Sequence, residues 1–155
     1  MRRVLRWMAA ALVLAASGSA MAQEPALTIT DGKQTVEFTR EQLAGMKQEV
    51  IETSSKWIEG VNKFSGPLIM DLLNEAGFAG ETIEAEALDK YSLDVPRSHL
   101  TGDGAILAIS MNDKPLPEEQ APFWIIFPYD QNPETKNEEH ESWSVYKLAK
   151  LTVKP

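Results

Sequence analysis

The sequence predicts a single α+β domain, with a mixed, β-rich sheet structure and a few short helices. Short runs of alternating apolar and polar residues recur along the chain, which is typical of strands with one buried face. Only residues 67–76 have the apolar spacing of a well-buried helix. Residues 23–155, which remain after an expected N-terminal signal, have the length of one domain with one core.

The first 22 residues have the features of a cleavable secretory signal. A positively charged start precedes an apolar run, residues 7–16, that is shorter than the roughly 20 residues a membrane-spanning helix needs. Ala20-Met21-Ala22 matches the small-x-small pattern that signal peptidase cleaves. We expect cleavage after Ala22, a periplasmic location and no stable membrane insertion. The alternative is a retained membrane anchor.

The charge and the cysteine count exclude several classes of function. The chain has a net charge of −8, and removal of its first 22 residues would take away three arginines and no acid. Such an acidic domain repels phosphate backbones, so nucleic acid is not an expected partner. The sequence has no cysteine, which excludes a thiol nucleophile, a zinc–thiolate site and an iron–sulfur cluster. Its two histidines are 41 positions apart, which argues against a zinc site built on histidines.

The N-terminal third predicts a hairpin, a helix and a strand in that order. Residues 27–38 alternate on both sides of Gly32-Lys33, which predicts a β-hairpin. Thr39 and Gln42 have capping-box spacing, so a short helix should end near Gly45. Residues 47–54 alternate weakly and are expected to form a strand.

The middle of the chain carries the clearest helix. Pro67 suits a first turn, Ser65 or Gly66 could cap it, and Gly77 suits its end. Strands are expected around residues 83–87, 91–95, 105–111, 123–127 and 150–154. Residues 128–142 are polar and acidic, and we expect a long surface loop there, with a helical turn after Ser142. Calcium binding by that loop would need a ligand spacing that it lacks.

Several segments, in order, resemble a known family. Phe64-Ser65-Gly66-Pro67-Leu68 with Asp71-Leu72-Leu73 and Ala76-Gly77 resembles the "FxGxxLxDLLxxAG" motif of the sulfite oxidase–type molybdopterin-binding domain. Further segments resemble this family's "DGY", "LAxxxNGxPLP", "PxRxxxP" and "KWxxxxxV" motifs, and they are residues 88–92, 107–117, 122–128 and 143–153. The resemblance extends from about Trp57 to Val153 and implies a sulfite oxidase–like fold.

The resemblance also shows where this chain departs from the family's cofactor site. The family's molybdenum-ligating cysteine lies about a dozen residues before the motif glycine, which corresponds to Ser54 here. A hydroxyl is a harder and less acidic ligand than a thiolate. Trp124 stands where the family has a cofactor-binding arginine. We therefore expect no catalytic residues, no metal and no cofactor, with molybdopterin as the cofactor only if the alternative function holds.

The candidate site is a remnant cleft framed by the segments that would surround the family's cofactor. Trp57, Trp124 and Trp143 could line an apolar pocket, although core packing is the alternative role. Arg97 could be a remnant phosphate contact or a solvated side chain. The candidate cleft residues are Ser54, Trp57, Arg97, His99, Trp124 and Trp143.

These observations favour a non-catalytic module that binds a small ligand or a periplasmic or inner-membrane protein partner. A fold does not fix a function, so this expectation rests on the site residues. The alternative is a genuine molybdopterin-dependent oxidoreductase with an atypical metal ligand or a partner subunit. A structural accessory subunit is a third hypothesis.

Overall fold

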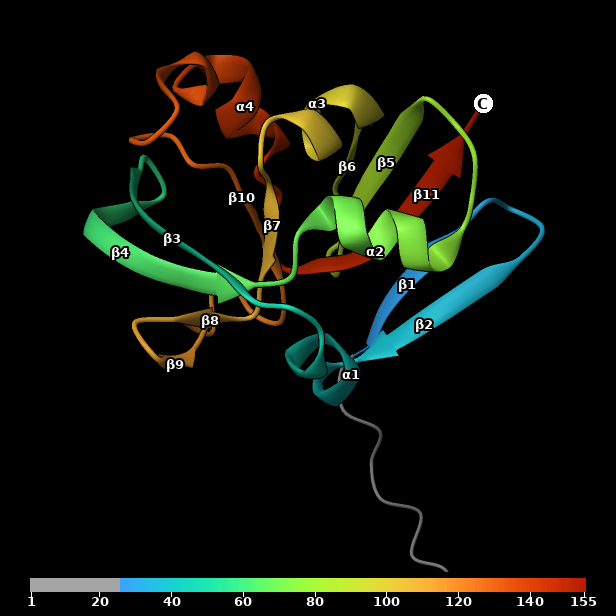
Figure 1. Cartoon of the computed structure of the whole chain (residues 1–155), viewed down its shortest axis with the longest axis horizontal. Helices are drawn as coiled ribbons and strands as arrows, with labels where there is room; N and C mark the ends of the chain where they lie inside the picture. Colours follow the sequence, from blue (N-terminus) through green and yellow to red (C-terminus); the bar gives the residue numbers. More distant parts are fainter. Residues whose placement is uncertain (1–25) are drawn as a thin grey trace, which may run out of the picture.

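The computed structural model describes residues 26–155, and their elements are arranged as Figure 1 shows. In chain order they are β1 (Ala26–Thr30), β2 (Thr35–Thr39), α1 (Arg40–Gly45), β3 (Glu49–Ser55), β4 (Ile58–Gly66), α2 (Ile69–Ala76), β5 (Thr82–Ala87), β6 (Ser92–Pro96), α3 (Arg97–Gly102), β7 (Ile106–Ala108), β8 (Ser110–Met111), β9 (Lys114–Pro115), β10 (Trp124–Ile126), the 3-10 helix η1 (Pro133–Thr135), α4 (Glu138–Trp143) and β11 (Leu148–Lys154). The α+β prediction is confirmed.

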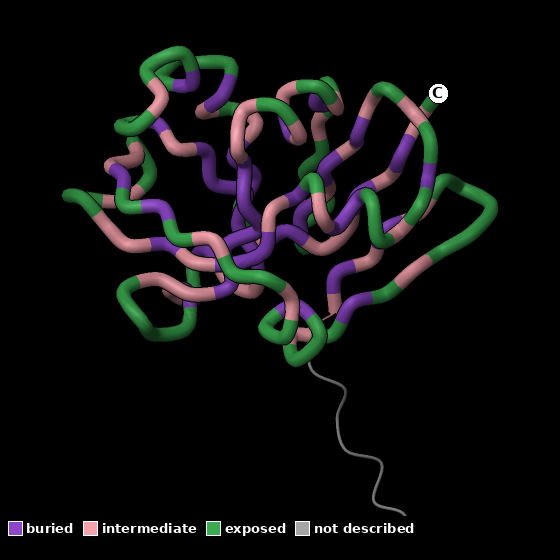
Figure 2. The backbone as a smooth tube through the Cα atoms, in the orientation of Figure 1, coloured by how far each residue is buried: buried purple, intermediate pink, exposed green. Residues whose placement is uncertain are grey.

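A five-stranded sheet forms one half of the domain. Its order is β2-β1-β11-β5-β6, and only β1 and β11 pair in parallel. The alternating residues of β1 and β5 bury Leu27, Ile29, Ile83 and Ala85 on one face, as strands with one solvated face should. Helix α2 packs its apolar side into the same core, which Figure 2 shows as buried chain through the centre of the molecule.

A second, smaller sheet forms the other half, in the order β3-β4-β8-β9, and β7 pairs with β10 beside it. These strands enclose a separate buried cluster that contains Phe64, Ile106, Trp124 and Ile126. Gly66, at the end of β4, lies against the backbone of β7. A Cβ atom at this position would lie 1.8 Å from the carbonyl oxygen of Leu107, so only glycine fits.

The predicted core helix is present, but it begins later than the sequence suggested. Helix α2 starts at Ile69 and ends at Ala76, and the next residue, Gly77, has the left-handed φ of +76° expected of a glycine that caps a helix. Pro67 belongs instead to a strand-like connection, because its carbonyl accepts a hydrogen bond from the Leu107 amide at 2.9 Å. Pairing with β7 therefore delays the helix by two residues.

The hairpin at residues 26–39 and the capped helix α1 are confirmed, including both hydrogen bonds of the Thr39–Gln42 capping box. Five elements were missed: β4, α3, β9, η1 and α4. Residues 128–142 do not form a long loop without regular structure, because η1 and α4 lie within them and their N-caps, Asn132 and Asn137, each accept a backbone hydrogen bond.

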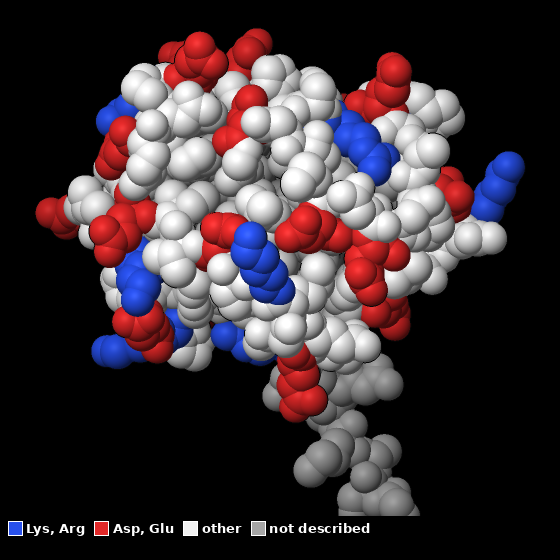
Figure 3. Space-filling model, viewed as in Figure 1, with Lys and Arg blue, Asp and Glu red and all other residues white. Residues whose placement is uncertain are grey.

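The predicted signal, residues 1–22, lies outside the described residues. Within residues 26–155, no helix is long and apolar enough to cross a membrane. Figure 3 shows acidic side chains scattered over the surface and gathered at the upper edge, where α4 lies in Figure 1.

Candidate functional site

The six candidate cleft residues do not form one site. Trp57 borders an open cavity, whereas His99 and Trp143 lie together in a separate aromatic cluster. Ser54 makes its contacts with the chain after β10. Arg97 donates hydrogen bonds to the carbonyl oxygens of Phe78, at 2.7 Å, and Gly80, at 3.2 Å, so it ties α3 to the segment after α2.

Trp124 does not line a cleft, because its side chain is fully buried. Its ring meets Phe64 edge-on, with centroids 5.3 Å apart, and its Nε1 donates a hydrogen bond to the Ser144 carbonyl at 3.1 Å. The alternative role of core packing is therefore the one that Trp124 has. The sequence could not show this, since a tryptophan on a short apolar strand suits either place.

The cavity beside Trp57 has a volume of about 380 Å³, in the lower part of the range typical of small-molecule sites. It lies where β3–β4, β5–β6 and the chain after α4 meet. Its walls combine aromatic rings with polar and charged side chains: Lys56, Trp57, Ala87, Asp89, Tyr91, Ser142, Ser144, Val145, Tyr146 and Lys147. Nothing in the sequence pattern singled out Tyr91, Tyr146 or Lys147, because three distant segments contribute them.

Three exposed aromatic side chains give the cavity its character. Trp57 is 41% exposed, Tyr91 55% and Tyr146 36%. The rings of Trp57 and Tyr146 meet edge-on, with centroids 5.8 Å apart. Apolar surface that several exposed aromatic rings share is a feature of ligand-binding sites, because a bound ligand removes this surface from water. The arrangement can accept a flat apolar ring.

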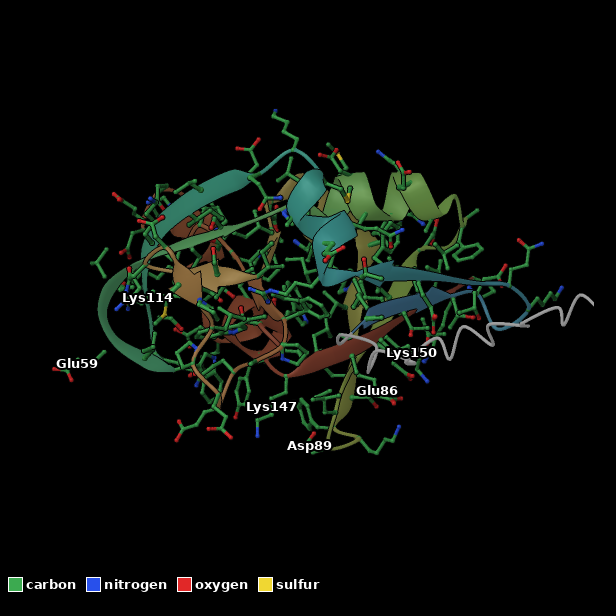
Figure 4. All side chains as sticks on the ribbon, turned by 90° about the horizontal axis from the view of Figure 1, so that it is seen from below. Glu59, Glu86, Asp89, Lys114, Lys147 and Lys150 are labelled. Atoms are coloured by element: carbon green, nitrogen blue, oxygen red, sulfur yellow. The ribbon has the colours of Figure 1, made fainter. Side chains whose placement is uncertain are left out.

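Positive charge lies at the edge of the cavity. The Lys56 ammonium is 4.7 Å from the centre of the Trp57 ring and 3.1 Å from a Glu141 carboxylate oxygen. Lys147 has a φ of +53°, in the left-handed region that non-glycine residues rarely adopt. Its carbonyl accepts a hydrogen bond from Leu88 and its amide donates one to Gln120, which holds this conformation. Figure 4 labels Lys147 and Asp89 on the same side of the molecule.

Ser54 is held by a carboxylate. Its amide donates to Asp130 Oδ2 and its hydroxyl donates to Asp130 Oδ1, both at 2.8 Å. The backbone hydrogen bond from Ser54, together with Lys136 and the Ser54 hydroxyl, lowers the pKa of Asp130 to about 2. The carboxylate therefore stays ionised at neutral pH and keeps the Ser54 hydroxyl occupied as a donor.

A third group of side chains lies between α3 and α4. Asp103 Oδ2 is 2.6 Å from His99 Nδ1 and 2.7 Å from His140 Nε2. Burial opposes the ionisation of Asp103, but its close contacts with the His140 and His99 imidazoles outweigh burial and lower the pKa of this carboxyl. Trp143 packs against both imidazole rings, at 4.9 Å and 4.8 Å between centroids. Sequence analysis missed this group, because no local spacing connects residues 99–103 to residue 140.

The family model described as oxidoreductase molybdopterin binding domain matches residues 26–128. The chain belongs to this family, and the predicted resemblance is confirmed.

Comparison with solved structures supports the same fold. The crystal structure of the sulfane dehydrogenase SoxCD from Paracoccus pantotrophus is similar, with a TM-score of 0.64 and 19% identity. The match covers 85% of this chain and 38% of that one, so this chain corresponds to well under half of that protein. No curated protein sequence matches the chain.

The expectation that no cofactor is involved is wrong, because the matching family is defined by molybdopterin binding. The departures at Ser54 and Trp124 concern how a molybdenum atom and a phosphate would be held, and they do not exclude the pterin ring. The side chains present fit that ring better than they fit the metal. The cavity offers aromatic walls, whereas the Ser54 hydroxyl donates to Asp130. Metal coordination by Ser54 would require breaking this hydrogen bond.

Proposed function

We propose that this domain binds a flat heteroaromatic ligand in the cavity beside Trp57 and does not carry out oxidoreductase chemistry by itself. The aromatic cavity is the observation that carries the proposal. Pterin is the ligand class that family membership favours. The domain would then present or sequester such a ligand, as an oxidoreductase-type fold used for binding.

The shape of the cavity supports a ring-shaped ligand. Trp57 and Tyr146 offer ring faces and edges from two different segments, and Tyr91 adds a third from the turn between β5 and β6. A ligand inserted among them would cover apolar surface that the free protein leaves exposed. The carboxylate of Asp89 and the hydroxyl oxygen of Ser142, which donates to Glu139 but can still accept, supply polar partners that orient a heterocycle.

The lysines support an anionic substituent on that ligand. Lys56 and Lys147 both line the cavity. In the described part of the chain, Lys147 has no carboxylate within ion-pairing distance, so its charge is available to a ligand. A pterin that carries a phosphate would combine a ring for the aromatic walls with a charge for these lysines.

The absence of catalysis is proposed from the chemistry of Ser54. The family resemblance places the metal-binding thiolate at this position, and a serine hydroxyl is both harder and much less acidic. Here the hydroxyl and the amide of Ser54 bind the same carboxylate, Asp130. Nothing in this arrangement supplies the soft anionic ligand that a molybdenum centre takes from the protein.

Export to the periplasm is proposed from the sequence of residues 1–22. The charged start, short apolar run and Ala20-Met21-Ala22 site support it. The intact mass of protein from a periplasmic extract should begin at Gln23. Protein that retains residues 1–22 in a membrane fraction would contradict this part of the proposal.

Replacement of Trp57 by alanine should weaken ligand binding at least about fivefold, because one wall of the cavity is removed. Base–aromatic stacking contributes about 1–3 kcal/mol per ring, which corresponds to roughly 5- to 150-fold in affinity. The measurement is quenching of tryptophan fluorescence during titration with a soluble pterin, supported by calorimetry.

Tyr146→Ala tests the adjoining aromatic wall. Val61→Ala serves as a matched control, because Val61 is 67% exposed and does not line the cavity. Val61→Ala should bind the pterin as the wild type does. Equal pterin affinity in the wild type, Trp57→Ala and Tyr146→Ala would show that the pterin does not bind in this cavity. Turnover of sulfite or a sulfoxide by the purified domain would instead favour the oxidoreductase alternative.

A further inference from the structure

The group formed by His99, Asp103 and His140 has the composition of a metal site. The three residues come from α3, its C-cap and α4. One ligand atom from each lies within 4.8 Å of the other two. None of the three lines the cavity beside Trp57, so this group is separate from the proposed ligand site.

The hydrogen bonds around His140 indicate which of its two ring nitrogens carries a hydrogen. Asn137 Oδ1 accepts the His140 backbone amide at 3.0 Å as the N-cap of α4, and its amide nitrogen donates to the Glu134 carbonyl at 2.8 Å. These two bonds fix which end of the Asn137 side chain is the oxygen. His140 Nδ1 lies 3.0 Å from the same oxygen and must therefore carry a hydrogen.

A neutral His140 with its hydrogen on Nδ1 has a lone pair on Nε2. That lone pair points at Asp103 Oδ2, 2.7 Å away, which also offers only lone pairs when ionised. Two acceptors at this distance repel unless a positive centre lies between them. Either a proton makes His140 an imidazolium, or a metal ion takes the position between the nitrogen and the oxygen.

We infer that His99 Nδ1, His140 Nε2 and the Asp103 carboxylate bind a divalent transition-metal ion of the zinc class. Two imidazoles and one carboxylate are a donor set suited to such ions, and three protein ligands leave a fourth position for water or another ligand. Exposure of the His99 side chain, at 44%, and of Asp103, at 26%, gives the ion a path from solvent. The sequence-based expectation was that no metal site exists, so this inference replaces it.

Metal binding requires the three ligand atoms to adjust their positions. Ligand atoms around tetrahedral zinc, at about 2.0–2.1 Å from the metal, lie about 3.3 Å apart. The carboxylate oxygen is now 2.6 Å and 2.7 Å from the two nitrogens, so it must move back by about 0.6 Å to admit the ion. The two imidazole nitrogens, which lie within 4.8 Å of each other, must also close around the ion. Because Asp103 is partly exposed at the end of a helix, rotation of its side chain can provide this movement.

The surroundings are already arranged as a metal site requires. His140 is only 5% exposed, and its Nδ1–H group donates to Asn137. A metal-binding imidazole usually donates its other ring hydrogen in this way, which fixes its orientation. Phe127 and Trp143 pack against the His140 ring, with centroids at 4.9 Å and 4.8 Å. Acidic residues on α4, Glu138, Glu139 and Glu141, favour a cation over an anion here.

Titration of the purified metal-free protein with Zn²⁺ and Co²⁺ tests the inference. Calorimetry should give one Zn²⁺ per chain. Bound Co²⁺ should quench the fluorescence of Trp143 and show the visible absorption bands of a four-coordinate cobalt site. His99→Ala and Asp103→Asn should each weaken Zn²⁺ binding at least about 100-fold. His99 is partly exposed, so its replacement should leave the fold intact, which circular dichroism can verify.

Glu139→Gln is the matched control, since it removes a nearby negative charge but no ligand atom, and it should change the affinity less than about threefold. Binding should also persist in Trp57→Ala, which separates failure here from failure of the pterin proposal. The absence of saturable binding by the wild type would overturn the inference, as would equal affinity in His99→Ala. In either case a shared proton would account for the close contacts.

Discussion

Trp124→Ala should lower the free energy of unfolding by about 3–5 kcal/mol, the usual loss when a large buried aromatic side chain is truncated. The side chain is fully buried in the smaller core cluster, and its ring packs edge-on against Phe64. Truncation would leave a void in that cluster. It would also leave the Ser144 carbonyl without the indole hydrogen bond, which adds an unsatisfied polar group.

Urea unfolding of the wild type and Trp124→Ala measures this loss. Trp124→Phe should lose less, because it retains most of the ring volume and removes mainly the hydrogen bond. Trp57→Ala is the comparison at an exposed tryptophan and should cost about 1 kcal/mol or less, as surface changes do. A loss below about 1 kcal/mol at Trp124 would contradict its place in the core and return it to the list of possible cleft residues.

Leu72→Ala should lower the free energy of unfolding by about 2–5 kcal/mol. Leu72 is fully buried on α2, in the larger core cluster between this helix and the five-stranded sheet. The chain has no cysteine, so no disulfide limits the unfolded ensemble and packing alone must provide stability. A loss of this size is a large share of the 5–15 kcal/mol typical of a domain.

Met70→Ala is a matched control on the same helix, because Met70 is 39% exposed. It should change the free energy of unfolding by no more than about 0.5 kcal/mol. Similar losses at residues 70 and 72 would mean that the buried face of α2 has been assigned wrongly. Chemical denaturation followed by far-ultraviolet circular dichroism distinguishes the two results.

The parts of the fold that depend on local pattern could be predicted from sequence. The alternation of residues 27–38, the Thr39–Gln42 capping box and Gly77 each determine structure within a few residues, and each predicted feature is present. The first turn predicted for residues 67–76 was wrong, because Pro67 pairs with β7, about forty residues away. Short helices such as α3 and α4 have too few turns to show a helical period.

The candidate site was less predictable because its contacts are distant in the sequence. Trp57, in the turn between β3 and β4, lies beside Tyr146, in the connection between α4 and β11, and Ser54 contacts Asp130 across 76 positions. His99 and His140 are far apart in the sequence, but the packing of α3 and α4 places the centroids of their rings 5.3 Å apart. The expectation of no cofactor failed for a different reason. It was drawn from missing metal and phosphate contacts, which say little about binding of the pterin ring.

The pterin content of protein purified from a host that makes molybdopterin tests the central claim most directly. The wild type should carry a pterin, detected by its fluorescence after oxidative release, and Trp57→Ala should carry much less. Neither protein should turn over sulfite or a sulfoxide. A wild type without pterin, or one whose pterin content is unaffected by Trp57→Ala, would contradict ligand binding in the aromatic cavity. Turnover that depends on Ser54 would contradict a purely binding role.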